Sequence, residues 1–488
     1  MDDQILMQND LKWYPHFDDA ISVEDATEYI QSPELVSKHN FFPFLKYSQR
    51  WTKYAKKGEK GKVKEREIRY AARKDAYIYM HYRRILSKSY EQCLLASGLN
   101  ESILAYRKLL KKDGVSGKCN IDFAKEAFDE IKRLGDCTVV ALDISSYFES
   151  LDHELLYCLW CQMLEVERLP KDHFHVFRNI TSYSIVDLQD VYERLGYFGN
   201  KTKGKAGNDI KGYLVSKREM PTKLCDGKTF RQKIIGHGGK GKSLVRKNFK
   251  PYGIPQGAPI SDLLANLYLL EFDKLVNSWM QAVGGKYLRY SDDILLILPG
   301  GKKEGIQYFR KVQESINKFG TKLKISDAKS SVFVFENNGE FQYFSVVFGE
   351  KGKNGLEYLG FRYNGRAVFI RDSTLSNLHR KITFEAKRQA YAHVLRYPGK
   401  NIEELKSLFN YEQAIKRFGR VEDFGSDGFP SEKSVYKSWT FWTYITRAVK
   451  TFQGTRNRFY RQMKCHEKIV RDRIDDGLAR ALRRVNAS

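Results

Sequence analysis

The stretch YSDDILLILP, residues 290–299, places two adjacent acids, Asp292 and Asp293, in front of an otherwise apolar run. The five aliphatic residues that follow them, 294–298, are typical of a buried strand. Burying an unpaired carboxylate costs several kcal/mol, and two neighbouring carboxylates also repel each other. Another part of the chain or a bound cation therefore has to compensate this charge.

A second acid stands in a similar place upstream. The segment CTVVALDISSYFESLDHELL, residues 137–156, begins with a β-branched strand pattern that ends at Asp143, and a turn and a helical pattern follow. An acid at the end of a strand is often only a helix N-cap, and we predict that Asp152 caps the helix that begins HELLYCLW. Asp143 alone therefore does not decide between a structural role and a chemical one.

Between the two acidic segments lies YGIPQGAPISDLLANLYLLEFDKL, residues 252–275, in which glycines and prolines crowd the first eight positions. This pattern predicts a shaped loop, and we expect Ser261 and Asp262 to cap a long apolar helix after it. Further on, Asn-Gly pairs at 354–355 and 364–365 predict tight hairpins. The order is therefore a strand ending in an acid, a helix, a loop with a helix, an acidic hairpin and another hairpin.

The composition indicates a polyanionic partner. The 488 residues include 84 Lys and Arg against 59 Asp and Glu, which gives a net charge of +25. This surplus favours nucleic acid first and an anionic membrane second. No apolar run approaches the ~20 residues that a membrane span needs, and the acidic start MDDQILMQND lacks the pattern of a secretory signal. Seven scattered cysteines are expected to be reduced thiols in a cytoplasmic protein.

Two regions concentrate the positive charge. Residues 46–88 interleave basic residues with aromatic ones at spacings that we interpret as helical, which suits either a nucleic-acid contact or a solvated helix over an aromatic core. Residues 201–250 contain GHGGKGKS, 236–243, which matches the phosphate-loop pattern G-x-x-x-x-G-K-[ST]. A phosphate loop needs a strand before it and a helix after it. RQKII, 231–235, is a candidate strand, but the seven residues 244–250 leave little room for a helix, so we predict a flexible basic loop.

These blocks, in this order, resemble the palm of a reverse transcriptase. In that family the first aspartate lies in a run matched here by DISSYFESLDH, 143–153, and the second block is matched by IPQGAPISDLLANLYL, 254–269. The third block, Tyr-x-Asp-Asp, is matched by YSDD, 290–293. Two later blocks are similar to LKISDAKSSVF, 323–333, and EYLGF, 357–361. Five blocks in the correct order make a chance match negligible.

The resemblance implies an RNA-directed DNA polymerase that uses two Mg²⁺ ions, with Mn²⁺ as a substitute. It assigns catalytic roles to Asp143, Asp292 and Asp293, and it implies metal ligation by these three side chains and by the backbone carbonyl of Ile144. Hard oxygen ligands suit Mg²⁺, and divalent cations would neutralise the gathered carboxylates. The alternative is a structural salt bridge, for which Arg289 is the one basic candidate within these blocks.

The resemblance assigns nucleotide-binding roles to four further residues. Phe148 falls where the family places a ring that clashes with a ribose 2′-hydroxyl, and the alternative is an ordinary core phenylalanine. Gln256 falls at the contact with the nucleotide sugar, and Lys329 falls where a lysine approaches the triphosphate. Arg107, in LAYRKLLKKDG, is the finger residue best suited to pair with the triphosphate.

The expected fold is α+β: a right-handed polymerase with fingers and palm, in which an antiparallel sheet packs on helices, and an all-helical, thumb-like C-terminal domain. We expect an acidic N-terminal segment over 1–45 and a basic, helical, fingers-like region over 46–136. The palm should cover 137–372 with a basic insertion over about 195–250, and a helical nucleic-acid-binding domain should cover 373–488.

Within the C-terminal part we expect an interrupted middle, 419–434, and a long amphipathic stretch over 436–485. This part and the Ser-Asp variant of the second block resemble bacterial reverse transcriptases of the unknown-group and abortive-infection types, relatives of retrons and group II introns. The resemblance implies antiphage defence with a dedicated non-coding RNA as template or scaffold, dNTP substrates, a DNA product and no membrane partner, and it allows a homo-oligomer. Primer- or template-independent synthesis by the same palm, and a retron- or maturase-like RNA-processing role, stay open as alternatives.

Overall fold

The computed structural model describes residues 6–52, 61, 63–203, 208–216, 219–238, 241–350, 352–418 and 441–486. The chain divides into two compact units. The first comprises Met1–Arg107, Val140–Leu296 and Ile306–Ser330, and the second comprises Lys108–Val139, Ile297–Gly305 and Ser331–Ser488. Each helix in the described ranges is too short or too polar to cross a membrane.

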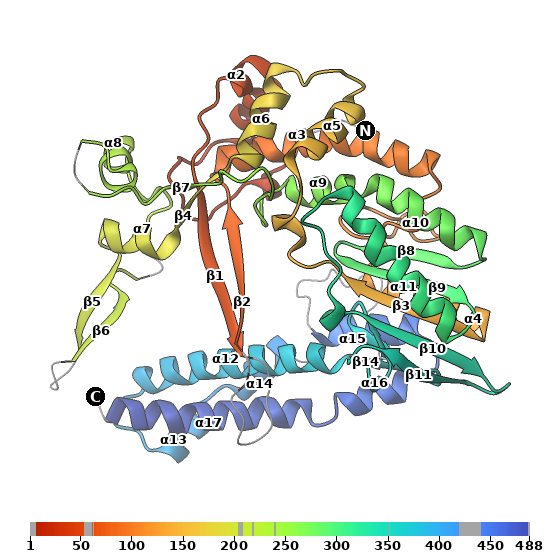
Figure 1. Cartoon of the computed structure of the whole chain (residues 1–488). Helices are drawn as coiled ribbons and strands as arrows, with labels where there is room; N and C mark the ends of the chain where they lie inside the picture. Colours follow the sequence, from red (N-terminus) through yellow and green to blue (C-terminus); the bar gives the residue numbers. More distant parts are fainter. Residues whose placement is uncertain are drawn as a thin grey trace. The chain divides into compact units, whose positions relative to one another are not determined.

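The region predicted to be a basic helix from residue 46 onward begins instead as a β-hairpin. The structure orders the N-terminal part as η1 (Gln8–Asp10), α1 (Val23–Gln31), α2 (Pro33–Ser37), β1 (Phe44–Thr52), β2 (Val63–Tyr70) and α3 (Arg73–Ala96). Figure 1 shows β1 and β2 as a long two-stranded ribbon. The helical interpretation was wrong here because the charges alternate with period two, so that Arg50 faces Glu65 across the strands at 3.1 Å. Within the described residues of 46–136, α3 and the later helix over residues 120–134 are helical as predicted.

A five-stranded sheet has the order β11–β10–β3–β9–β8. Its strands are β3 (Cys137–Asp143), β8 (Lys286–Tyr290), β9 (Asp293–Pro299), β10 (Ser331–Asn337) and β11 (Gln342–Phe348). The aliphatic residues of β9, 294–298, are all buried, as the sequence predicts. Helices α4 (Asn120–Leu134), α9 (Ser261–Tyr268), α10 (Leu270–Ala282) and α11 (Lys302–Ile316) accompany the sheet in the chain. The predicted α+β class, with antiparallel strands and helices, is confirmed.

The segment after β3 stays within the first unit. It contains η2 (Tyr147–Glu149), α5 (His153–Leu164), α6 (Lys171–Thr181), β4 (Ser184–Asp187), α7 (Leu188–Leu195), β5 (Phe198–Lys203) and β6 (Asn208–Tyr213). After the β5–β6 hairpin come α8 (Gly227–Thr229), the π-helical turn η3 (Phe230–Ile235) and β7 (Arg246–Lys247). A second sheet has the order β2–β1–β4–β7.

The surroundings of GHGGKGKS are not those of a phosphate loop. The candidate strand RQKII lies in η3 and is therefore helical, which corrects that expectation. The described residues after 243 form β7 rather than a helix. Two residues of the motif, 239 and 240, lie outside the described residues. The strand and the helix that would aim backbone N–H groups at a phosphate are both replaced by other structure.

The second unit ends in helices. After η4 (Asn317–Phe319) and η5 (Asp327–Lys329), the chain forms β12 (Leu356–Tyr358), β13 (Phe361–Tyr363) and β14 (Val368–Ile370), and the predicted Asn-Gly turn at 364–365 joins the last two strands. The helices are α12 (Asp372–Arg396), α13 (Ile402–Ser407), α14 (Tyr411–Phe418), α15 (Phe441–Thr451), α16 (Arg456–Gln462) and α17 (His466–Asn486). In Figure 1, α12 and α17 lie side by side.

The long amphipathic stretch predicted over 436–485 is three helices in the structure. The chain leaves the helical conformation at Gly454 (φ +75°) and again at Cys465 (φ +67°), which separates α15, α16 and α17. Hydrophobic periodicity alone did not reveal these breaks because all three helices keep an apolar face. The predicted interruption at 419–434 lies outside the described residues.

Candidate active site

Backbone hydrogen bonds bring the ends of three distant segments together around Asp143. The Ile144 N–H donates to the carbonyl of Asp292 at 3.0 Å, which ties the end of β3 to the turn between β8 and β9. The Ser326 N–H donates to the carbonyl of Asp143 at 2.9 Å, and the Ser145 N–H donates to that of Lys324 at 2.9 Å. Three of the sequence blocks are therefore neighbours in space, and all of these residues belong to the first unit.

Two carboxylates and one ammonium meet at this junction. The Lys329 Nζ donates to Asp143 Oδ1 at 2.5 Å, across 186 residues of sequence. Burial raises the pKa of the Asp292 carboxyl, the charge of Asp143 raises it further, and the Lys329 ammonium opposes both effects. The structure thus brings together three of the residues that the sequence singled out, and their charges act on one another.

The other two predicted metal ligands lie next to this pair in the chain. Asp293 is the first residue of β9 and is exposed, whereas Ile144 is buried. The turn before Asp292 is strained, since Ser291 has φ +60°, a left-handed conformation that is rare for residues other than glycine. This turn sets Asp292 at the end of the hairpin, so that the backbone conformation helps to fix the position of its carboxylate.

The salt-bridge alternative assigned Arg289 to these acids, but Arg289 has another partner. Its Nη2 and Nε donate to the two carboxylate oxygens of Asp273 at 2.5 and 2.7 Å, and both side chains are 0% exposed. The Tyr287 hydroxyl also donates to Asp273, at 2.6 Å. Arg289 is therefore part of a closed, buried network between β8 and α10, and it does not pair with Asp143 or Asp292.

Phe148 lies in η2, five residues after Asp143, and its side chain is half-buried. The neighbouring Tyr147 is buried, and its hydroxyl donates to the carbonyl of Ala265. The Phe148 carbonyl accepts a hydrogen bond from the Ile254 N–H at 2.8 Å, which joins η2 to the loop that carries Gln256. Tyr147 thus holds η2 in place, and the Phe148 ring is the partly accessible one of the two.

The loop around Gln256 is held against the end of β2. The Arg69 N–H donates to the Gln256 carbonyl at 3.1 Å. Gly257 has φ +115°, and a Cβ at this position would lie 2.3 Å from the Arg69 carbonyl oxygen, so that only glycine fits. The Arg69 side chain pairs with Glu67 at 2.8 Å, and its buried Nε has no partner among the described residues. Sequence reasoning missed Arg69 because it did not recognise the hairpin.

Arg107 is occupied within its own segment. Its Nε and Nη2 donate to Glu91 at 2.8 and 2.5 Å, and its remaining hydrogen bonds go to Asn100 and to the carbonyl of Ile103. The side chain is only 2% exposed. All of its N–H groups are thus engaged, so that Arg107 has no free donor for the predicted pairing with a triphosphate.

The residue before Arg107 reaches the acidic turn instead. The Tyr106 hydroxyl donates to Ser291 Oγ at 3.3 Å, and the pKa of Tyr106 is raised by burial and by the nearby charge of Asp292. Arg83 donates to the Tyr106 carbonyl and to Asp262, both at 3.0 Å. A positive φ of +63° at Tyr106 turns the ring in this direction, and no sequence signal marks that conformation.

Two capping predictions had different outcomes. Asp152 caps α5 as predicted, because its Oδ1 accepts from the N–H groups of Glu154 and Leu155. Ser261 does not cap α9, since its hydroxyl donates to the carbonyl of Pro255 at 2.8 Å and so closes the loop. The predicted long helix is divided into α9 and α10 at Leu269. Ser261 is used to close the loop and Asp262 pairs with Arg83, so neither of the two residues expected to cap α9 does so.

Solved structures that resemble this chain include telomerases of two Candida species. Apo telomerase of Candida tropicalis, truncated from the C-terminal domain, is 11% identical with a TM-score of 0.36, and 72% of this chain and 61% of that chain are covered. Telomerase of Candida albicans in complex with a fragment of telomeric RNA is 11% identical with a TM-score of 0.34, and 94% and 64% are covered. This chain thus spans under two thirds of their length.

A family model gives the more specific finding. No curated protein matches the chain. Residues 217–363 match the model described as reverse transcriptase (RNA-dependent DNA polymerase). The matched range includes Gln256, Asp292, Asp293 and Lys329, and it begins after Asp143. The chain therefore contains a reverse-transcriptase domain, the domain of RNA-directed DNA polymerases.

Proposed function

We propose that this chain is an RNA-directed DNA polymerase that joins deoxynucleotides by nucleotidyl transfer with two divalent cations. The observation that carries the proposal is the meeting of Asp143 and Asp292, whose like charges have Lys329 beside them while Arg289 is engaged with Asp273. The close approach of two carboxylates becomes energetically favourable when bound cations neutralise their charges.

The donor atoms of this site fit a hard cation. Carboxylate oxygens are the ligands that Mg²⁺ prefers, and Mn²⁺ accepts the same set. The described residues contain no cluster of three or more His, Cys, Asp or Glu side chains arranged to hold a metal ion. We assign Asp143 and Asp292, whose charges act on each other, as the side-chain ligands, with the Ile144 carbonyl and Asp293 in supporting roles. Two bound cations would activate the primer 3′-hydroxyl and stabilise the leaving oxygen.

The remaining residues would position the incoming nucleotide. We assign Lys329 to Asp143 in the metal-free protein and to the triphosphate in the substrate complex. Phe148, accessible at its ring and fixed at its backbone, would stand under the sugar, and Gln256 would contact the sugar from the facing loop. Arg69 and Tyr106 join this set as residues that line the same region, whereas Arg107 is a structural residue of its own segment.

The biological setting is proposed from the sequence blocks and from the net charge of +25. We propose a dedicated non-coding RNA as template or scaffold, dNTPs as substrates and DNA as the product, in cytoplasmic antiphage defence. A homo-oligomer is compatible with this role. The positive charge would serve the phosphate backbone of the RNA, so that binding should weaken as salt is raised.

The test is incorporation of labelled dTTP on oligo(dT)-primed poly(rA) with Mg²⁺. We expect synthesis that stops with a chelator and is absent in Asp143→Asn. Sequencing the nucleic acids that co-purify with the protein would identify the template. Synthesis that needs no primer or template would identify the alternative mode of the same palm. RNA processing that persists in Asp143→Asn would favour the retron- or maturase-like role, and failure to incorporate any dNTP on any template would overturn the polymerase proposal.

A further inference from the structure

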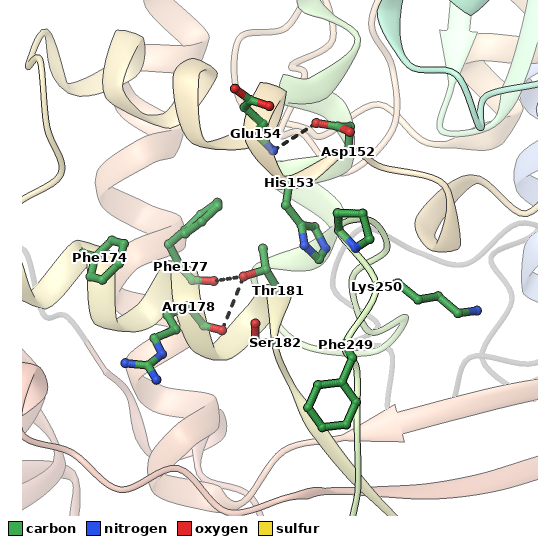
Figure 2. Close-up of a pocket in the computed structure, with 11 residues that line it drawn as sticks. Asp152, His153, Glu154, Phe174, Phe177, Arg178, Thr181, Ser182, Phe249 and Lys250 are labelled. Atoms are coloured by element: carbon green, nitrogen blue, oxygen red, sulfur yellow. Dashed lines mark hydrogen bonds between the residues drawn. The ribbon is translucent and has the colours of Figure 1, made fainter.

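A pocket with a volume of about 540 Å³ lies within the first unit, and its lining does not include the residues of the candidate active site. The start of α5, one side of α6 with the residue after it, and residues 249–251 line it (Figure 2). Its size is in the range of pockets that hold a small organic molecule or one nucleotide. None of the roles proposed above for the reaction uses it.

The first notable property of this pocket is its exposed aromatic surface. Phe249 is 85% exposed and Phe174 is 46% exposed, whereas Phe177, which also lines the pocket, is buried. An exposed phenylalanine ring gains nothing from the core and leaves apolar surface in water, at about 25 cal/mol per Å². Phe249 has Lys247 over its ring at 5.8 Å. A flat apolar ring next to cations is the surface on which a nucleobase stacks.

The second property is the distribution of charge. Arg178 and Lys250 line the pocket, and Arg178 has no ion-pair partner among the described residues. Two acids also line it, but the Asp152 carboxylate is used as the cap of α5. Figure 2 shows Asp152 and Glu154 together at one end, away from Arg178 and Phe249. Arg178 and Phe249 therefore lie at a part of the pocket away from both carboxylates.

The third property is the covalent and hydrogen-bonded link to the loop of Gln256. The Gly253 N–H donates to the Leu151 carbonyl at 2.7 Å, and the His153 N–H donates to that of Pro251 at 3.0 Å. His153 Nε2 pairs with the Gly253 carbonyl at 2.8 Å, and burial lowers the pKa of His153. Burial therefore favours the uncharged form of this imidazole. Backbone hydrogen bonds therefore join the pocket to the loop that carries Gln256.

We propose that this pocket is a binding site for an unpaired nucleotide of a single-stranded RNA, whose base stacks on Phe249 and whose phosphates contact Arg178 and Lys250. Segment 246–252 combines three basic and two aromatic residues, as surfaces that bind single strands do. Lys250 and Lys322 also lie over the ring of Tyr252, at 5.6 and 5.4 Å. The choice of RNA rests on the proposed function, but binding at this pocket does not require polymerase activity.

The experiment measures binding of a fluorescently labelled single-stranded RNA oligonucleotide to the full chain, without dNTPs. Phe249→Ala should raise Kd by about 5-fold to 100-fold, the usual loss for one stacked base. Phe249→Trp should keep the affinity, and its indole emission should be quenched when RNA binds. Trp13→Ala is the matched control, because Trp13 is 66% exposed at a distant place in the sequence and should leave Kd unchanged.

A second variant tests the phosphate contact. Arg178→Ala should weaken binding and reduce the slope of log K against log salt by about 0.7, the value for one phosphate of a single strand. Duplex RNA of the same sequence should bind all variants equally, because its bases are already stacked on one another. Melting curves should coincide, since both side chains are exposed.

Three results would overturn the proposal. One is an unchanged Kd in Phe249→Ala together with constant emission in Phe249→Trp. Another is an equal loss for duplex RNA, which would indicate a general electrostatic contact. The third is a loss confined to single-stranded DNA or to an acidic peptide, which would assign the pocket to another partner. If the wild type binds RNA as expected but synthesises no DNA, the proposed function fails while this inference stands.

Discussion

Two carboxylate sites on neighbouring elements of the first unit have opposite properties. Asp273 is fully buried, and Arg289 and Tyr287 satisfy both of its oxygens at 2.5–2.7 Å. Asp143 and Asp292 instead meet as like charges at the end of β3 and the adjoining turn, with the Lys329 ammonium on Asp143. The first site is complete within the protein. The second site keeps an excess of negative charge.

This difference teaches how to separate structural acids from chemical ones. A buried ion pair is tolerated only when its geometry and its hydrogen bonds repay the desolvation of both ions, as at Asp273. A carboxylate pair that repels internally and is held by the backbone is an arrangement for binding something from outside. Substitutions at the chemical site should therefore change activity, and substitutions at the structural site should change stability.

The largest effect is expected at the chemical site. Asp292→Asn should lower DNA synthesis by about 10³-fold or more, because a cation ligand that contributes several kcal/mol to the transition state is lost. The melting temperature should not fall. Primer extension under single-turnover conditions measures this, with the exposed Glu314→Gln as the control. Near-normal synthesis in Asp292→Asn would contradict the assignment.

The structural site should respond in stability. Arg289→Leu leaves Asp273 buried without its cation, and such a loss costs about 3–5 kcal/mol. We expect a clear drop in the denaturation midpoint, and any loss of activity should follow the fraction of unfolded protein. Chemical denaturation of the variant beside Asp292→Asn makes the contrast direct. A variant Arg289→Leu that is as stable as the wild type would contradict the structural role assigned to the pair of Arg289 and Asp273.

A smaller effect is expected at two adjacent aromatic residues, Phe148 and Tyr147, of which the first is assigned to the nucleotide and the second to the fold. Phe148→Ala should leave dNTP use largely intact and raise ribonucleotide incorporation by about 10-fold to 100-fold, because only a clash with the 2′-hydroxyl is removed. Tyr147→Phe, which loses the hydrogen bond to Ala265, should instead lower stability by about 1 kcal/mol. Incorporation of dATP and ATP beside melting curves measures both. An unchanged ratio in a destabilised Phe148→Ala would make Phe148 a packing residue.

The smallest effect is a dependence of stability on pH. Because the pKa of Asp292 is raised in the folded state, the folded protein holds a proton that the unfolded chain has lost between the ordinary and the raised carboxyl pKa. Stability contributed by this group is therefore lost as pH rises through that window. At pH 7 without metal, Asp292→Asn should melt slightly above the wild type, and the difference should vanish below the ordinary pKa.

The control for this last prediction is the metal. Added Mg²⁺ should raise the melting temperature of the wild type, since a ligand of the folded state stabilises it, and should raise that of Asp292→Asn much less. Scanning calorimetry from pH 3 to pH 8, with chelator and with Mg²⁺, measures both effects. A wild type that stays more stable than the variant in chelator at pH 7 would contradict the inferred repulsion between Asp143 and Asp292.

The sequence by itself determined the features that depend on a few adjacent residues. The apolar run 294–298 with its preceding acids, the strand that ends at Asp143, the Asp152 cap and the turn at 364–365 all follow from local pattern. The order of the blocks also predicted which of them would meet, and Asp143, Asp292 and Lys329 do interact in the structure. Their catalytic roles stay predictions.

Only the tertiary structure decided which partner each charge takes. Arg289 pairs with Asp273 and Arg107 with Glu91, while Tyr106 turns to the acidic turn and Phe44–Thr52 pairs with Val63–Tyr70 as strands. These choices depend on which surfaces meet across many residues and on a few positive φ values. Local composition does not encode either quantity, because the energy of a charge is set by burial and by neighbours that the sequence places far away.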